Sequence, residues 1–150
     1  MPTLSPMAVA AAAYLGGFSS GQIPTAVAVA RGESSFNTDL YNGSCCYGLW
    51  QINAEAHKVA DTNSLKDPVV NAKMANRVVS SRGWCGGKAP NGHCQAFEAY
   101  QLDNGGMTWA QKLADKTLAA FRQLQLLKDT DASLKSGRDL ALKTFDEVAD

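Results

Sequence analysis

The chain has 150 residues, the length of one domain, which is enough to bury roughly 70% of the surface of the unfolded chain. Hydrophobic residues make up 45% of it and charged residues 19%, which is ordinary for a globular protein. Fourteen basic residues balance fourteen acidic ones, and the Lys and Arg residues are scattered along the chain. We therefore expect no nucleic-acid partner and no membrane partner, since both favour concentrated positive charge.

An apolar run from Met7 to Leu15 lies near the start of the chain. It is too short to span a bilayer, and no positively charged segment precedes it as in a secretory signal. We predict a core helix over 6–15 that Gly16 and Gly17 end. If the protein leaves the cell, we expect export or release by a route other than a secretory signal.

A second, almost wholly apolar helix is predicted from Pro24 to about Glu33. Proline is favoured in the first turn of a helix, and a helix that is apolar on every side is a buried one. The last turn of a helix carries partial negative charge, which favours the neutral form of a carboxyl group there. Glu33 is therefore a candidate proton donor, although an exposed glutamate at a helix end is the commoner outcome.

The segment 38–53 is predicted to form a small hairpin or irregular β-element just after this glutamate. Asn42-Gly43 is a turn signal between two short extended pieces. A short helix is expected to follow at about 55–59. The β-element is thus placed to form one wall of a cleft.

Four further helices are predicted in the second half of the chain. Asp67-Pro68 supplies a cap and a proline start for a helix that runs to about Ser81, and Gly83 ends it. The other three are expected at 95–102, at 108–127 and from 133 or 135 to 148. We therefore predict a single, predominantly helical α+β domain over 1–150, completed by C-terminal helices in 107–150.

The four cysteines are Cys45, Cys46, Cys85 and Cys94, and their pairing stays open. Neighbouring cysteines rarely pair with each other, whereas Cys85 and Cys94 bracket a glycine-containing loop that can bring them together. A crossed pairing between the two halves is a further alternative among the three connectivities. Disulfides suit a virion, the periplasm or the extracellular space. A zinc site with His93 lacks the usual C-x-x-C spacing, so we predict no metal and no cofactor.

Four short motifs follow one another along the chain. They are Glu33-Ser34, Gly48-Leu49-Trp50-Gln51, Asp67-Pro68-Val69-Val70-Asn71 and Ala99-Tyr100. In this order and spacing, over residues 6 to about 106, they resemble the lysozyme-like superfamily, and most of all its soluble lytic transglycosylase and phage lysozyme branch. The resemblance implies a lysozyme-like fold with a β-hairpin beside the catalytic cleft. It also implies a glycosidase that cleaves the β-1,4 bond between N-acetylmuramic acid and N-acetylglucosamine in peptidoglycan.

By this resemblance Glu33 is the general acid and base, and Tyr100 hydrogen-bonds and orients it. The residues expected to bind the substrate are Ser44, Tyr47, Trp50 and Gln51. Ser44 and Gln51 would lie near the N-acetyl group, and the aromatic rings are candidates for stacking on sugars. For Trp50 a role in the core is an equal alternative.

One position departs from a related pattern. Animal-type lysozymes carry an aspartate immediately before the Tyr-Gly of the β-element, where this chain has Cys46. The nearest other acids are Asp39, expected in a solvated turn, and Glu55, expected in the first turn of a helix. We therefore expect a one-carboxylate mechanism, in which the acetamido group of the substrate stabilises the positive centre.

The sequence thus predicts a muramidase or a lytic transglycosylase, and leaves hydrolysis and a 1,6-anhydro product equally open. Small size and the lack of a secretory signal favour a phage endolysin or a virion-associated wall-piercing enzyme, while a bacterial wall-remodelling enzyme shares the same chemistry. The alternative is a non-catalytic, lysozyme-like virion structural or glycan-binding protein. We expect a monomer that acts on glycan strands of the cell wall, in the periplasm, outside the cell or on a virion.

Overall fold

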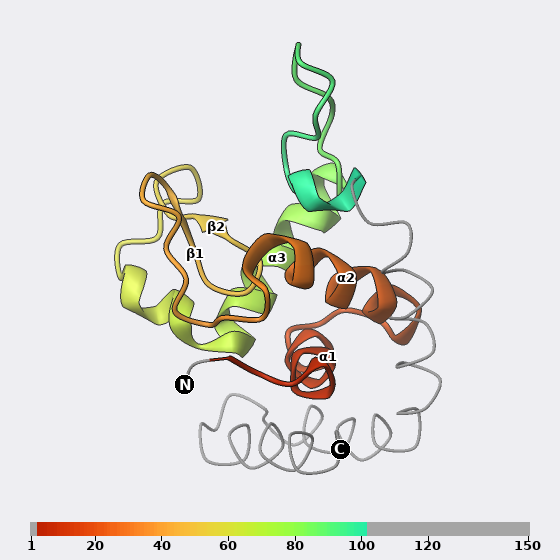
Figure 1. The fold of residues 1–150 in the computed structure, drawn as a ribbon, viewed down its shortest axis with the longest axis vertical. Helices are drawn as coiled ribbons and strands as arrows, with labels where there is room; N and C mark the ends of the chain where they lie inside the picture. The colour runs from red at the N-terminus through yellow and green to blue at the C-terminus, as the bar shows by residue number, and fades with distance from the viewer. Residues whose placement is uncertain (1–2, 102–150) are drawn as a thin grey trace.

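The computed structural model describes residues 3–101. Within that range the chain forms three α-helices, three short 3₁₀ helices and one two-stranded antiparallel hairpin (Figure 1). This confirms the prediction of a predominantly helical α+β fold. The helices predicted at 108–127 and from 133 or 135 to 148, and the role predicted for 107–150, lie outside the described residues.

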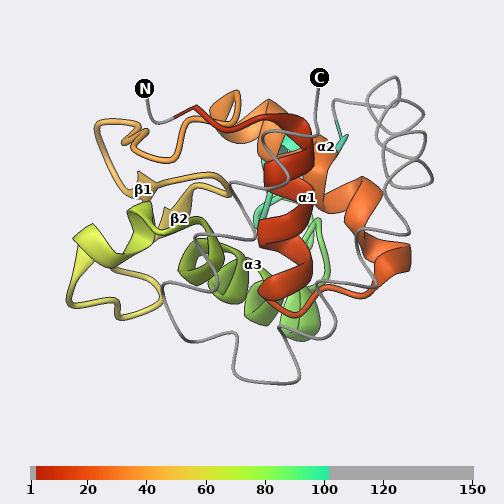
Figure 2. The ribbon, with the colours of Figure 1, turned by 90° about the horizontal axis from the view of Figure 1, so that it is seen from below.

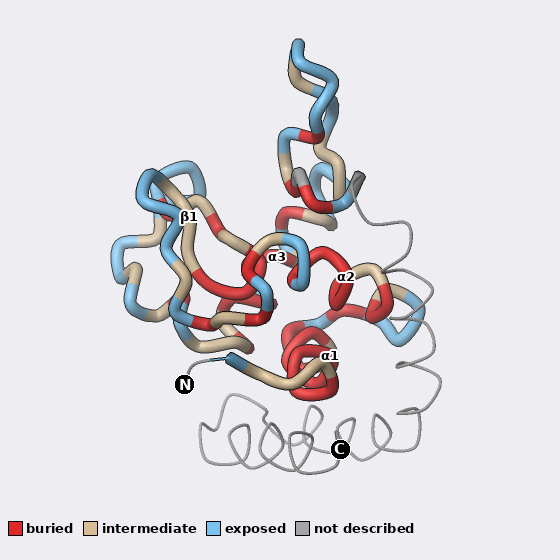
Figure 3. The backbone as a smooth tube through the Cα atoms, viewed as in Figure 1, coloured by how far each residue is buried: buried red, intermediate tan, exposed pale blue. Residues whose placement is uncertain are grey.

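Helix α1 spans Pro6–Leu15, as the sequence predicts. The Ser5 side chain caps it by accepting a hydrogen bond from the Ala8 N–H at 3.1 Å, and a proline occupies its first turn. Almost every residue of α1 is buried, which is why its sequence is apolar on all sides (Figure 3). Its final turn packs closely on α3, because a Cβ on Gly16 would overlap the Ala72 side chain.

Helix α2 spans Ile23–Ser34, directly after the 3₁₀ helix η1 at Ser20–Gln22. The predicted buried helix from Pro24 to about Glu33 is confirmed to within one residue at each end. Helix α2 packs against α1 and against the 3₁₀ helix η3 (Glu98–Gln101). It therefore crosses the interior of the described domain and delivers its C-terminal end to the side where the β-element lies (Figures 1 and 2).

The β-element consists of β1 (Cys46–Tyr47) and β2 (Ile52–Asn53), paired antiparallel. The turn at 48–51 joins the two strands, and an isolated bridge between Tyr41 and Tyr47 adds the chain before β1. The predicted small β-element over 38–53 is therefore confirmed. The Asn42-Gly43 turn lies between Tyr41 and β1, so it comes before the hairpin.

The helix predicted at 55–59 is wrong, because this segment is a series of turns. The Asn53 side chain accepts a hydrogen bond from the Ala56 N–H at 3.0 Å, and the Val59 N–H reaches back to the Ala54 carbonyl at 2.8 Å. Lys58 has a φ of 56°, a left-handed conformation that stops a right-handed helix from continuing.

Helix α3 spans Pro68–Arg82 and confirms the helix predicted from Asp67-Pro68. The Asp67 carboxylate accepts hydrogen bonds from the first free N–H groups of the helix, and Gly83, at a φ of 75°, ends it. The 3₁₀ helix η2 at Thr62–Lys66, which leads into α3, was not predicted.

Beyond α3 the chain makes an arm that projects from the body of the domain (Figure 1). The Cys85–Cys94 disulfide and a bridge between Lys88 and Cys94 hold its two sides together. The chain then enters η3, a single 3₁₀ turn where the sequence predicts a longer helix over 95–102. No helix among residues 3–101 is long and apolar enough to cross a membrane.

Candidate active site

Glu33 is the second-last residue of α2 and is half-buried. The next residue, Ser34, is buried, and its hydroxyl donates to the Ala30 carbonyl at 3.0 Å. Ser35 and Phe36 then both take a positive φ, of 50° and 64°. Two such non-glycine residues in a row are rare, and strain of this kind gathers at functional sites. The chain therefore reverses sharply just beyond the carboxyl group and holds it at the edge of the core.

The segment that contacts Glu33 is η3. The Ala99 N–H points at the Glu33 Oε1 across 3.4 Å, a long hydrogen bond. Close approach depends on Gly32, because a Cβ there would lie 2.7 Å from the Ala99 Cβ. The ring of Tyr100, 45% exposed, stacks on Trp84 with centroids 6.4 Å apart. In the structure the residue before Tyr100 thus contacts Glu33, and the expected Tyr100–Glu33 hydrogen bond stays a prediction.

Asn71 fixes the turn at 48–51 to α3. Its side chain is fully buried: Oδ1 accepts from the Trp50 N–H at 2.9 Å, and Nδ2 donates to the Tyr47 and Leu65 carbonyls, both at 2.9 Å. Gly48 has a φ of 78°, and a Cβ on it would overlap the Asn71 amide. The sequence motifs contained Asn71 without giving it a role. The sequence feature that indicated a role was a polar residue among the apolar residues of a predicted helix.

Trp50 fastens the same turn to α2. Its ring has 0% exposure, and its indole N–H donates to the Ala26 carbonyl at 2.9 Å. A sugar has no access to a ring that is covered in this way. Trp50 is therefore a core residue and not a substrate-binding one, which is the alternative that the sequence allowed.

The other three predicted substrate residues lie on the β-element. Gln51 is half-buried, and its amide donates to the Leu40 and Gly48 carbonyls at 3.0 and 2.9 Å. Tyr47 is half-buried and stacks on Tyr41, with centroids 4.6 Å apart. Ser44 is exposed in the loop before β1. All three are therefore accessible to a substrate, to different degrees.

Cys85 bonds to Cys94, the pairing that the loop between them allows, whereas Cys45 bonds to its neighbour Cys46, a pairing that the sequence did not favour. The local reason is Asn42, whose Oδ1 accepts hydrogen bonds from three successive backbone N–H groups, at residues 44 to 46, within 3.1 Å. These bonds curl the chain tightly around the Asn42 amide at the point where the two sulfurs meet.

The position that an aspartate holds in animal-type lysozymes therefore carries a disulfide, through Cys46. Asp39 and Glu55, the two nearest acids along the chain, are both exposed in turns. None of these residues brings a second buried carboxylate to Glu33.

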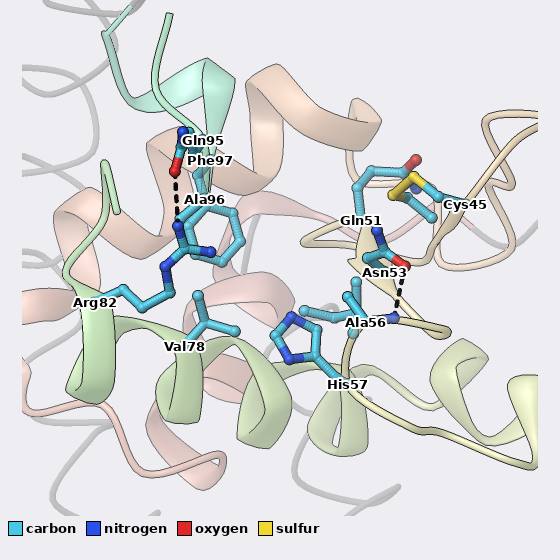
Figure 4. A pocket seen from close by; sticks show the side chains of 12 residues that line it. Cys45, Gln51, Asn53, Ala56, His57, Val78, Arg82, Gln95, Ala96 and Phe97 are labelled. Atoms are coloured by element: carbon cyan, nitrogen blue, oxygen red, sulfur yellow. Dashed lines mark hydrogen bonds between the residues drawn. A yellow bond between two sulfur atoms is a disulfide. The ribbon is translucent and has the colours of Figure 1, made fainter. Parts of the chain in front are cut away.

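A cavity of about 370 Å³ lies between the β-element and the C-terminal end of α3 (Figure 4). It is enclosed by the β-element with the turns after it, by the last turns of α3, and by residues 95–97. Gln51 belongs to its lining, whereas Glu33 does not. One segment of the chain connects the two: Phe97 lines the cavity, and Ala99, two residues further along, contacts Glu33.

Comparison with known families bears directly on this arrangement. A family model described as a lysozyme-like domain matches residues 10–86, just over half of the chain. The chain belongs to the lysozyme-like domain family. Membership implies a glycosidase that acts on the peptidoglycan of the cell wall. Comparison with curated proteins and with solved structures gives no match.

The lysozyme-like match covers the end of α2 with Glu33, the turn at 48–51 and the start of α3 with Asn71. It ends at residue 86, in the first part of the arm and before Ala99-Tyr100. The matched range thus includes Glu33, the turn at 48–51 and Asn71, whereas the segment 95–101, which also contacts Glu33, lies outside it.

Proposed function

We propose that the protein cleaves the β-1,4 bond between N-acetylmuramic acid and N-acetylglucosamine, with Glu33 as its one catalytic acid and base. The observation that carries this proposal is the position of Glu33. It is a half-buried carboxyl at the negative end of a buried helix, beside a turn that Asn71 and Trp50 fix to the core.

In the proposed reaction Glu33 gives its proton to the glycosidic oxygen as the bond from that oxygen to the anomeric carbon breaks. The acetamido oxygen of the substrate then stabilises the positive anomeric carbon. Water, or the 6-hydroxyl of the same sugar, attacks this carbon and returns a proton to Glu33. A single carboxylate is enough for this scheme, and the exposure of Asp39 and Glu55 supports it.

Three groups are proposed to bind the glycan. Gln51 and Ser44 supply polar contacts near the N-acetyl group, and the Tyr47 ring offers an apolar face to a sugar. Tyr100 is proposed to orient Glu33, since it directly follows Ala99, whose N–H contacts the carboxyl group.

We further propose a setting outside the reducing cytosol, as in a phage endolysin or a virion-associated wall-piercing enzyme. The two disulfides support such a setting, since disulfides persist in oxidising surroundings. The competing function is a lysozyme-like domain that binds glycan without cleaving it, and the same experiment distinguishes the two.

The test measures the fall in turbidity of purified cell walls with the parent protein and with Glu33→Gln. Glutamine keeps the size of the side chain and removes the transferable proton, so we expect activity to fall by about a hundredfold or more. Glu55→Gln, a change of the same type at an exposed turn, is the matched control and should clear walls like the parent. Equal clearing by the Glu33 variant would contradict the assignment, and binding without clearing by the parent would favour the non-catalytic function.

A further inference from the structure

The residues that line the cavity are one arginine with polar and apolar side chains. Its volume of about 370 Å³ is within the range of small-ligand sites. One side is formed by Arg82 and Gln95, and the facing side by Gln51, Asn53 and the Cys45–Cys46 disulfide (Figure 4). Of the described residues that line it, none is Asp or Glu. The formal charge of the lining is therefore positive.

Arg82 is held in place but retains free donors. Its Nη2 donates to the Gly86 carbonyl at 2.8 Å and to the Gln95 Oε1 at 3.0 Å, which fixes the guanidinium at the edge of the cavity. Among the described residues, Nη1 and Nε have no acceptor within bonding distance. A guanidinium has five donor hydrogens, so the three on Nη1 and Nε remain, and each of them can donate singly to an anionic oxygen such as that of a carboxylate.

The rest of the lining combines amides, the His57 imidazole and small apolar surfaces. Gln51, Asn53 and Gln95 carry amide groups, and Ala56, Val78 and Ala96 carry aliphatic ones. The one Phe, Tyr or Trp side chain among the described lining residues, Phe97, is only 2% exposed. The cavity therefore lacks the open aromatic face on which a sugar ring stacks. It fits a chain of amides with methyl groups and a carboxylate, which is a short acidic peptide.

We propose that this cavity binds the acidic stem peptide carried by N-acetylmuramic acid, with Arg82 pairing with one of its carboxylates. The inference rests on the proposed function and deepens it, because the substrate becomes glycan that still bears its peptides. The position supports this: residues 95–97 line the cavity, and Ala99 in the same segment contacts Glu33. The cavity and Glu33 thus contact the same short segment of the chain.

The test compares two substrates, glycan strands with their stem peptides and the same strands after an amidase has removed the peptides. The parent should cleave the peptide-bearing strands with the lower KM. Because Arg82 is exposed, we expect Arg82→Gln to raise that KM about fivefold, and to leave cleavage of the stripped strands unchanged. Arg77→Gln is the matched control, an exposed arginine of the same helix outside the cavity lining, and it should match the parent on both substrates.

Three results would overturn the inference while the proposed function stands. Equal KM values for the two substrates with the parent would show that the peptide is not bound. An equal loss on both substrates in Arg82→Gln would show that Arg82 only supports the arm through Gly86 and Gln95. A loss confined to the stripped strands would assign the anion to the lactyl carboxylate of the sugar.

If the parent cleaves neither substrate, the proposed function fails and the inference is decided by binding alone. The probe is a soluble stem tetrapeptide, titrated calorimetrically into the parent protein and into Arg82→Gln. Weaker binding by the variant than by the parent would support the inference, whereas no binding by the parent would overturn it.

Discussion

Gly32 sets the distance between the last turn of α2 and η3. Because Gly32 has no side chain, Ala99 can pack closely against it: a Cβ on Gly32 would lie only 2.7 Å from the Ala99 Cβ. This close packing brings the Ala99 N–H to the Glu33 carboxyl. Gly32, which has no side chain, therefore allows the Ala99 N–H to reach the proposed catalytic acid.

The replacement Gly32→Ala tests this packing. Alanine favours a helix over glycine by about 1 kcal/mol, so the helix itself should not be weakened. The added methyl group must instead move η3 and its N–H away from Glu33, and we expect wall cleavage to fall by about tenfold. Activity and thermal midpoint are measured together, with Gly21→Ala as the control, since a Cβ there meets nothing within 4 Å. A fully active Gly32→Ala protein would show that the contact has no role in catalysis.

At the scale of elements, one buried amide connects the β-element to the helical part of the domain. Asn71 of α3 satisfies three backbone groups, those of Tyr47, Trp50 and Leu65. The bonds to Trp50 and Leu65 are buried, so water cannot replace the Asn71 amide there, and the bond to Tyr47 is partly buried. The position of the turn at 48–51, and with it Gln51 at the cavity, depends on this side chain.

The replacement Asn71→Ala should therefore be strongly destabilising. It leaves buried backbone donors and acceptors unpaired, and we expect the free energy of unfolding to fall by about 3 kcal/mol in urea denaturation. Asn76→Ala, in the same helix but half-buried, is the control and should change stability by less than about 0.5 kcal/mol. A comparable loss in the two variants would refute the role of Asn71.

The elements that the sequence predicted best are those with local signals at their ends. Capping residues and proline starts define α1 and α3, and glycines end them. The turns at 54–58 escaped prediction because they depend on the Asn53 side chain and on the left-handed Lys58. The sequence also left the role of Trp50 open, because its ring is buried only when α2 and the hairpin pack together.

At the scale of the whole molecule, the described residues form a helical body, a β-element and a projecting arm around two adjoining features. One feature is Glu33, which the sequence identified by its motif. The other is the cavity with Arg82 and Gln95, which the sequence did not reveal, because its lining comes from segments far apart along the chain. The pairing of Cys45 with Cys46 likewise depended on the fold of the loop around Asn42.

The central claim is that this fold cleaves one particular bond, and mass spectrometry of the products tests it most directly. Purified peptidoglycan is digested for the same short time by the parent protein and by Glu33→Gln, and the soluble fragments are identified. We predict fragments from the parent whose new end is N-acetylmuramic acid, either reducing or lighter by one water as the 1,6-anhydro form, and no such fragments from the variant. Fragments whose reducing end is N-acetylglucosamine, fragments from peptide cleavage, or the same fragments in equal amount from the variant would contradict the account.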